Sequence, residues 1–462
     1  MDILLVEPGY RNKYPPIGLM KLSQYHKGKG DCVEFVKGIS EEKRDKSWDR
    51  IYISSLFTYD WAETIKAIKY YRFSVKGQPS NDLIVGGVLG SLLGDDIIEE
   101  VNCKVVKGLL DSNGKLGFED DGVIDSMVPD YSILDEIEYK YPTSNAYIGY
   151  STKGCIRKCK FCAVPKIEPA FKNYLPISEQ IDSIREKYGP KRDLLLLDNN
   201  VLASSEFEKI IDQIRVRGFE RGAKFVYKNR NGQEVKVQRI VDFNQGIDAR
   251  LLDEKKMELL STIAIRPLRI AFDNIAYAEL YKRKVRLACK YGIKHLSNYV
   301  LYNYLDKPGE FYERLRINVE LNEELGVQIY SFPMRYIDLG SKSRSTSIKK
   351  NVGKHWNKKY LRAIQCVLNA TKGIVGVKKG FFQRAFGKDI DEYRKILLMP
   401  EEFILKRNEH RDDGSTELWW DLYNGLDMHE KEIFSSLVVR RDEYQTDGRE
   451  LSEALFKVLS YY

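Results

Sequence analysis

The chain has 462 residues, 43% of them hydrophobic, and a net charge of +8, which suggests two to four globular domains of mildly basic character. The apolar runs are all far shorter than a membrane span, and the N-terminal run Met1 to Pro8 is too short and too acidic for a signal peptide. Seven cysteines without a paired framework favour a reducing compartment, so we expect a cytoplasmic protein with no membrane partner.

The first 125 residues alternate apolar runs with helical patterns. Strands are predicted at Ile3 to Val6, Val33 to Val36, Arg50 to Ser54 and Leu83 to Gly87, with helices at Ile17 to His26 and Trp61 to Phe73. This alternation predicts an α/β domain, a doubly wound parallel sheet of the flavodoxin-like type with helices on both faces. Such sheets bind ligands beyond the carboxyl ends of their strands, where Gly86-Gly87 would allow a close backbone approach.

A linker rich in Pro, Asp and Tyr at 126–144 leads into residues 145–338, which repeat strand then helix six times. The predicted strands are Tyr147 to Thr152, Asp193 to Asp198, Ile240 to Gly246, Leu268 to Asp273, His295 to Leu301 and Val327 to Pro333. Six such units predict a partial, TIM-like (βα)6 barrel, in which chemistry gathers where the strands end.

Two alternating runs flank Asn231-Gly232 within residues 224–237 and predict a tight hairpin inserted before the third barrel strand. The hairpin is basic. It is either a solvated decoration, since charged surface hairpins are common, or an arm that touches a polyanion.

The third region, residues 339–462, is predicted to be mostly helical, and its first part is basic. Between Leu339 and Lys388 there are 13 Lys and Arg and no acidic residue, with aromatic residues such as Trp356 and Phe382 among them. Such a stretch favours a nucleic-acid-binding surface, in which aromatic rings stack on bases. The candidate contacts are Lys349, Lys350, Lys354, Lys358, Lys359 and Arg362. The alternatives are a phosphorylated small substrate, an acidic partner, or a basic helical face whose aromatic residues lie in the core.

Three cysteines, Cys155, Cys159 and Cys162, follow the first barrel strand in a CxxxCxxC spacing. Three thiolates this close can hold three corners of a four-iron, four-sulfur (4Fe-4S) cluster and leave the fourth iron open for a ligand. A structural zinc site needs four ligands, usually in two pairs, and the sequence has no second pair. A disulfide in so short a loop would be strained, and an odd cysteine count leaves one thiol over. The spacing therefore indicates a reactive iron–sulfur cluster.

The CxxxCxFC loop resembles that of the radical S-adenosylmethionine (SAM) enzymes, whose core fold is also a six-unit partial barrel. The resemblance implies that Phe161 lies near the SAM adenine and that the open iron binds the amino and carboxylate groups of SAM. One electron, supplied by a flavodoxin or ferredoxin, would then cleave SAM and yield a 5′-deoxyadenosyl radical. Arg157, Lys158 and Lys160 would lower the thiol pKa values and offset the cluster charge.

The resemblance also assigns cofactor contacts by position at the ends of the barrel strands. These are Asp198, Asn200, Gln245, Asp248, Arg250, Asp273, Asn274 and Arg335. Asp198 and Asn200 would contact the SAM amino group, Arg250 would pair with the carboxylate, and Asp273 would bind the ribose. The usual GGE-type motif is absent after the second strand, and each residue could instead satisfy a loop backbone. No catalytic side chain is assigned.

The first domain resembles the cobalamin-binding domain that precedes many radical SAM cores. The resemblance includes Tyr14-Pro15-Pro16-Ile17-Gly18-Leu19 after the first strand and Val85-Gly86-Gly87 at the end of the fourth. The DxHxxG motif that supplies a cobalt ligand in one cobalamin class is absent, and His26 is expected to be a surface residue rather than a ligand. Either the domain binds cobalamin without this histidine, or it has the fold without the cofactor.

We therefore expect a radical SAM enzyme that cleaves SAM reductively to modify a substrate, with methylation as the reaction if cobalamin binds. The substrate is either a nucleic acid or a small molecule or peptide. Cys32 and Cys103 are too few for the second cluster of the methylthiotransferases. The alternative of another class is a nucleic-acid-binding protein whose cluster is structural or redox-sensing.

Overall fold

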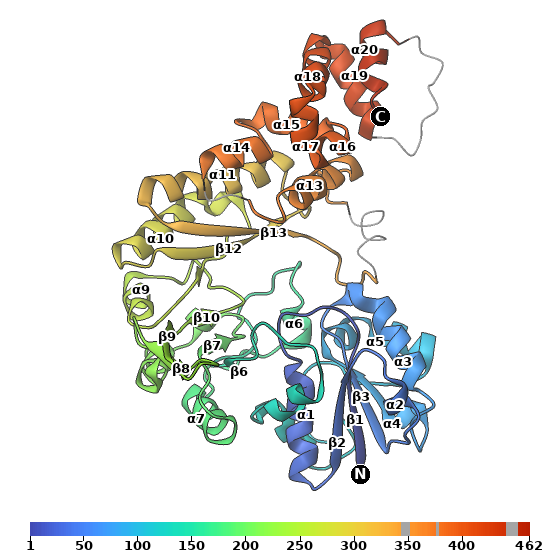
Figure 1. Ribbon diagram of the computed structural model, residues 1–462, viewed down its shortest axis with the longest axis vertical. Helices are drawn as coiled ribbons and strands as arrows, with labels where there is room; N and C mark the ends of the chain where they lie inside the picture. The colour runs from blue at the N-terminus through green and yellow to red at the C-terminus, as the bar shows by residue number, and fades with distance from the viewer. Residues whose placement is uncertain (343–351, 376–377, 440–450) are drawn as a thin grey trace. The chain divides into compact units, whose positions relative to one another are not determined.

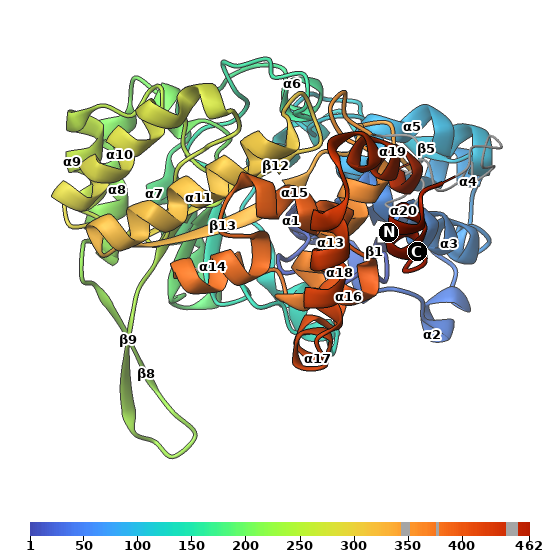
Figure 2. The ribbon, with the colours of Figure 1, turned by 90° about the horizontal axis from the view of Figure 1, so that it is seen from above.

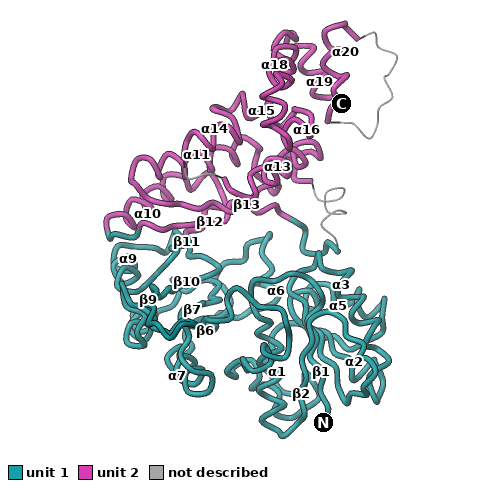
Figure 3. Tube along the Cα trace, in the orientation of Figure 1, with its two compact units in different colours: residues 1–269, 291–293, 337–347 teal, residues 270–290, 294–336, 348–462 magenta. Residues whose placement is uncertain are grey.

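The computed structural model describes residues 1–342, 352–375, 378–439 and 451–462. The chain forms two compact units (Figure 3): unit 1 holds Met1–Arg269 with short later segments, and unit 2 holds most of the chain from Ile270 to Tyr462. Within the described residues, every helix is too short or too polar to cross a lipid bilayer.

Unit 1 begins with a parallel five-stranded sheet of order β2-β1-β3-β4-β5 (Figure 1). Its strands are β1 (Asp2–Glu7), β2 (Cys32–Lys37), β3 (Arg50–Ser54), β4 (Leu83–Gly86) and β5 (Lys104–Val105), and its helices are α1 (Ile17–Gly28), α2 (Glu41–Arg44), α3 (Trp61–Tyr71), α4 (Pro79–Asp82) and α5 (Gly87–Val101). Leu4 of β1 packs with Ile68 of α3 and Leu93 of α5 in one core, and α1 covers the opposite face. This is the strand order of doubly wound, flavodoxin-type sheets.

In this order the crossover direction changes between β1 and β3, which leaves a crevice at their carboxyl ends. Several residues at this edge are small: Gly9 lies shortly after β1, Ser54 ends β3 and is followed by Ser55, and Gly87 follows β4. Gly87 has a φ of +82°, and a Cβ atom there would lie 2.5 Å from the backbone oxygen of Ser55. Glycine is therefore required where β3 and β4 end side by side.

A second parallel sheet in unit 1 has the order β10-β7-β6. Its strands are β6 (Ala146–Gly149), β7 (Asp193–Leu196) and β10 (Val241–Phe243), and the chain around them forms the helices α6 (Val164–Ile167), α7 (Ile177–Tyr188), α8 (Phe207–Ile214) and α9 (Glu254–Ser261). The short strand β11 (Leu268–Arg269) follows and does not belong to this sheet. Tyr14 and Ile17 of the first domain pack on Ala146, Ile148 and Leu195 of this sheet. The hairpin β8 (Lys224–Lys228) and β9 (Glu234–Gln238) is present as predicted and projects from the unit (Figure 2).

Unit 2 contains a parallel pair of strands and many helices. The elements are α10 (Ala278–Lys290), β12 (His295–Tyr302), α11 (Pro308–Leu325), β13 (Gln328–Arg335), α13 (Lys358–Ala370), α14 (Lys379–Phe386), α15 (Ile390–Leu398), α16 (Glu401–Leu405), α17 (Arg407–Asp412), α18 (Ser415–Gly425), α19 (Met428–Val439) and α20 (Glu453–Leu459). Arg314 of α11 is fully buried, and its guanidinium donates to the backbone oxygens of Leu301 and Asp273 and to the carboxylate of Asp306.

The predicted α/β class, with parallel sheets and many helices, is confirmed, and each predicted strand begins within one residue of its expected start. Several barrel strands end earlier than predicted. β7 ends at Leu196 rather than Asp198, and β11 ends at Arg269 rather than Asp273. In both cases apolar residues continue past the last residue of the strand, so the hydrophobic pattern alone predicts a strand that is too long.

The prediction of a surface position for His26 is wrong. His26 is fully buried in the last turn of α1. Its Nδ1 lies 2.6 Å from Asp31 Oδ2 and its Nε2 lies 3.0 Å from Tyr52 Oη. Burial lowers the pKa of His26, despite the opposing effect of Asp31. Both ring nitrogens are engaged within the fold, so this histidine is not available as a cobalt ligand.

Candidate cofactor site

The three clustered cysteines lie in one closed loop at the carboxyl end of β6. The loop is closed at its base by Lys153 and Lys172, whose backbone N–H groups each donate to the other's carbonyl at 3.2 and 2.9 Å. The N–H of Leu175 then donates to Ser151 O at 2.7 Å. Residues 154–171 therefore leave and rejoin the fold at one point, with all three thiols between.

Gly154, directly before Cys155, fixes how the loop begins. It has a φ of +70°, and a Cβ atom there would lie 2.3 Å from the backbone oxygen of Ala170. Its N–H donates to Glu168 Oε2 at 2.7 Å, and Asn199 Nδ2 donates to the same oxygen at 2.8 Å. Glu168 thus joins the two ends of the loop to the residues after β7.

Asp198 lies after β7 and is fully buried. Its carboxylate accepts from the backbone N–H and the hydroxyl of both Ser151 and Thr152, including Ser151 Oγ at 2.7 Å and Thr152 Oγ1 at 2.7 Å. Burial raises the pKa of Asp198, although these donors favour the charged form. The carboxylate therefore holds the end of β6 in place, and its predicted contact with the SAM amino group stays a prediction.

The sulfur of Cys155 accepts two hydrogen bonds. They come from the backbone N–H of Arg157 at 3.3 Å and from Asn200 Nδ2 at 3.4 Å. Asn200 is 2% exposed, and its Oδ1 has no hydrogen-bond partner in the described part of the chain. An unsatisfied buried acceptor beside a thiol is unusual, and it fits a ligand that brings an N–H donor.

The donor set fits an iron–sulfur cluster, although the thiols are not yet arranged around a metal. Cys155, Cys159 and Cys162 are partly exposed and form no disulfide. Among the described residues, no three or more His, Cys, Asp or Glu side chains are grouped as a metal site. Three thiols in one loop, one of them with two N–H donors to its sulfur, suit an iron–sulfur cluster rather than a four-ligand zinc site. Phe161 lies partly exposed between the last two.

Asp248, after β10, organises two arginines. Arg250 donates to both of its carboxylate oxygens, at 2.7 and 2.9 Å, and Arg157 of the cysteine loop donates at 3.1 Å. Burial alone would raise the pKa of Asp248, but these hydrogen bonds outweigh it and the pKa is lowered. The guanidinium predicted to bind the SAM carboxylate therefore already has a carboxylate partner. Gln245 Nε2 donates to Asn244 Oδ1 at 3.3 Å.

The other predicted contacts, Asp273, Asn274 and Arg335, belong to unit 2. The backbone oxygen of Asp273 accepts from Arg314 at 3.0 Å. Asn274 Oδ1 accepts from the N–H of Ala276 at 2.9 Å and begins a short 3-10 turn. Arg335 is half-buried, which lowers its pKa. Their contact with SAM stays a prediction.

A buried group of charges joins the base of the cysteine loop to the first domain. Lys153 is 3% exposed and forms an ion pair with Asp125, and Lys172 Nζ lies 3.6 Å from the same carboxylate. Lys21 of α1 donates to the backbone oxygen of Asp125. Burial, and then repulsion from Lys153, lower the pKa of Lys21 to about 7. Both Lys21 and Lys153 lie over the ring of Tyr150.

Sequence reasoning missed Glu7, at the carboxyl end of β1. It is fully buried, pairs with Lys37 Nζ at 2.8 Å and accepts from the hydroxyl of Tyr141. The ammonium of Lys37 also lies 5.1 Å from the ring centre of Tyr10 and 4.8 Å from that of Tyr139. An acidic residue that ends an otherwise apolar strand was the available signal.

In the described part of the basic stretch, the candidate side chains differ in their surroundings. Lys349 and Lys350 lie outside the described residues; Lys354 is exposed, Lys358 is half-buried, Lys359 is buried and donates to Met399 O, and Arg362 pairs with Glu401. Trp356, Phe382 and Phe386 lie in the core of unit 2. These rings cannot stack on bases, because other side chains already cover them, and nucleic-acid contact through the remaining lysines stays a prediction.

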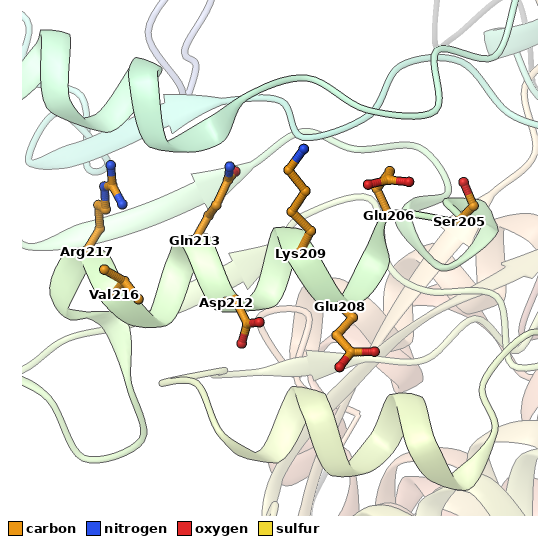
Figure 4. Close-up of a pocket in the computed structure, with 8 residues that line it drawn as sticks. All are labelled: Ser205, Glu206, Glu208, Lys209, Asp212, Gln213, Val216 and Arg217. Carbon is orange, nitrogen blue, oxygen red and sulfur yellow. The ribbon is translucent and has the colours of Figure 1, made fainter.

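A shallow recess lies along α8 (Figure 4). It is lined by Ser205, Glu206, Glu208, Lys209, Asp212, Gln213, Val216 and Arg217. The lining is charged and open to solvent, and it includes no cysteine and none of the predicted cofactor contacts. We therefore do not assign the cofactors to this recess.

The fold has been seen before in TsrM, a radical S-adenosylmethionine methyltransferase from Kitasatospora setae. With cobalamin and a [4Fe-4S] cluster bound, TsrM aligns at a TM-score of 0.51 over 79% of this chain and 75% of its own, with 15% identity. The two proteins therefore share a fold over most of their length. With tryptophan substrate and the SAM analogue aza-SAM bound, TsrM aligns at 0.50 over 79% and 76%, with 14% identity.

More distant matches add nothing to this. SuiB from Streptococcus suis, bound to its precursor peptide SuiA, aligns at a TM-score of 0.31 over 48% of this chain and 44% of its own, with 14% identity. No protein-family model and no curated protein matches the sequence. At these identities the likeness concerns the fold, so the chemistry must be argued from the residues of this chain.

We expect Gly154→Ala to prevent cluster assembly without unfolding the protein. The new Cβ would overlap the carbonyl of Ala170 and displace the loop, so iron bound after anaerobic reconstitution should fall to about half or less. Gly189→Ala is the matched control, because Gly189 also has a positive φ, +74°, but no atom within 4 Å of the added carbon. Equal iron contents in the two variants would contradict this account of the loop.

We expect Lys21→Met to remove a pH dependence of stability. The folded-state pKa of Lys21 is about 7 and its ordinary value is 10.5, so between these values the unfolded chain binds more protons. The contribution of Lys21 therefore raises the free energy of unfolding of the native protein as the pH rises from 7 to 10. Relative to the variant, the native protein should gain on the order of 2 kcal/mol in urea titrations across that range. Lys66→Met, at an exposed position, is the control. Its free energy of unfolding should differ from that of the native protein by the same amount at every pH in this range.

Proposed function

We propose that the protein is a radical SAM methyltransferase, with a 4Fe-4S cluster on Cys155, Cys159 and Cys162 and cobalamin in the first domain. The observation that supports this most is the position of the cysteine loop. The segment that carries all three thiols follows β6 at its carboxyl end, in a fold shared with a radical SAM methyltransferase. In parallel α/β folds, reactive groups gather at this edge.

The chain's own residues would hold and orient the cluster. Three thiolates supply three ligands, and N–H groups from Asn200 and Arg157 would stabilise negative charge on Cys155 Sγ. The exposed Lys158 and Lys160 beside the thiols suit an acidic flavodoxin or ferredoxin as reductant. When bound, the cluster would supply the electron that cleaves SAM, and the protein's part is to position the reactants and exclude water.

Asn200 is the residue we assign to SAM. Its Nδ2 is used by Cys155, and its buried Oδ1 lacks a partner in the described chain, so an ammonium group bound beside the thiols would satisfy it. For Asp198 and Arg250 we propose other roles than the contacts with the SAM amino and carboxylate groups that the sequence predicted. Asp198 holds the loop, and Arg250 is oriented by Asp248.

Cobalamin in the first domain would supply a methyl carrier. The edge formed by Gly9, Ser54, Ser55 and Gly87 has few side-chain atoms and lies at the crevice between β1 and β3, which suits a large ligand pressed against backbone. His26 would not ligate the cobalt, because both of its nitrogens are engaged. Without cobalamin, the same barrel would support another radical modification of a small molecule or peptide.

Anaerobic reconstitution with iron and sulfide, followed by SAM and dithionite, should yield 5′-deoxyadenosine or S-adenosylhomocysteine, because the thiols carry a cluster with an open iron. The Cys155→Ala, Cys159→Ala, Cys162→Ala triple variant should yield neither. Retention of hydroxocobalamin after gel filtration, followed by visible absorption, tests the first domain separately and should survive the triple change. A cluster whose spectrum ignores SAM would favour a structural or redox-sensing role instead.

Asn200→Ala should weaken SAM binding per bound cluster roughly tenfold, because one hydrogen bond to a charged group is lost. The SAM bound is compared at equal iron content, since loss of the Nδ2 donor to Cys155 Sγ should also lower the amount of cluster bound. Equilibrium dialysis of SAM against the reconstituted protein measures this. Asn231→Ala, an exposed change in the hairpin turn, is the control and should bind SAM normally. Native SAM affinity in Asn200→Ala would remove Asn200 from the site.

A further inference from the structure

The β8–β9 hairpin is a two-stranded sheet of its own, which pairs with no other strand in the described part of the chain (Figure 2). Its tip is well ordered: Asn229 Oδ1 accepts from the N–H of Asn231 at 2.9 Å and of Gln233 at 3.0 Å, and Gly232 takes the positive φ that the turn needs. An isolated two-stranded hairpin is only marginally stable. Hydrogen bonds at the tip and at the base stabilise this one. At its base, Arg239 is 9% exposed and donates to Lys191 O at 2.7 Å.

The two faces of the hairpin differ. Lys224, Val226 and Lys228 share one face, while Phe225 and Tyr227 share the other, because side chains alternate along a strand. Val226 and Tyr227 are 49% and 44% exposed. The rings of Phe225 and Tyr227 are stacked at 6.2 Å, so the second face presents aromatic surface to solvent.

Positive charge on the hairpin is largely uncompensated. Residues 224–238 contain four basic residues and one acidic residue, and only Lys236 pairs with that acid, Glu234, at 3.3 Å. Lys224, Lys228 and Arg230 make no ion pair with any residue that the structure describes. They contrast with Lys359 and Arg362 of the basic stretch, which are engaged within unit 2.

The hairpin leads into the amino end of β10, whereas the cysteine loop leaves the carboxyl end of β6. Because β6, β7 and β10 are parallel, the hairpin and the cysteine loop lie at opposite ends of the strands of one sheet in unit 1. A reductant must approach the cysteine loop, so it is not the partner of the hairpin. A partner of the hairpin either is separate from the chemistry or is long enough to extend around the barrel.

We propose that the β8–β9 hairpin is a nucleic-acid-binding arm. Its unpaired lysines and arginine suit phosphates, its exposed Tyr227 suits stacking on an unpaired base, and a two-stranded ribbon is slender enough to enter a major groove. A nucleic acid is also an extended polyanion, which is one of the two kinds of partner that the position of the arm allows. This surface replaces the basic stretch as the main nucleic-acid contact, and it does not depend on methyl transfer.

Fluorescence anisotropy with a labelled 20-nucleotide single-stranded RNA and a 20-base-pair DNA duplex tests the arm, using the full chain without added cofactors. Lys228→Gln with Arg230→Gln should weaken binding roughly tenfold near 0.1 M salt and reduce the slope of log K against log salt by about 1.4 for the single strand, at about 0.7 per phosphate contact. Tyr227→Ser should weaken binding to the single strand more than to the duplex.

Lys354→Gln with Lys378→Gln removes the same charge from exposed positions in the basic stretch and should leave binding within about twofold of native. The proposal is overturned if the two double variants lose affinity equally, if native binding ignores salt, or if polyglutamate competes as well as RNA at equal charge. The last result would indicate an acidic protein partner. Unchanged thermal unfolding would show that each variant remains folded.

Discussion

The buried carboxylate of Asp198 is the contact on which the candidate site depends. A fully buried acid is costly unless donors surround it, and here the N–H and hydroxyl groups of Ser151 and Thr152 do so. They come from the residue pair that links β6 to the cysteine loop. The pairing of β6 with β7 therefore decides where the loop begins, and Gly154 and Glu168 then decide its direction.

Fold and chemistry rest on different observations in this protein. The five-stranded sheet, the second parallel sheet and their likeness to a radical SAM methyltransferase describe a scaffold. The chemistry is argued from three thiols, the N–H groups that donate to Cys155 and the unsatisfied Oδ1 of Asn200. A scaffold of this kind could support several reactions, so these few groups near the loop carry the functional argument.

Local pattern was enough to predict the strands and the cysteine loop, because burial alternation and spacing are properties of neighbouring residues. It could not assign Asp198, whose donors lie about 47 positions earlier, and it placed His26 on the surface because the packing of α1 on β3 is not local. Two residues of the basic stretch show the same limit of local pattern. Arg362 pairs with Glu401, beyond the acid-free segment, and the long stem of Lys359 is buried.

The salt link between Lys153 and Asp125 has a consequence for how this architecture can change over time. Asp125 comes from the first domain's last loop, and Lys153 forms the base of the segment that holds the thiols. Loss of the leading domain would remove this counterion together with side chains that bury the Lys153 ammonium group, so the base of the cysteine loop would be exposed to water. The two halves of unit 1 are therefore not interchangeable modules. A descendant protein that lost the first half would need new residues at the base of the cysteine loop in the second.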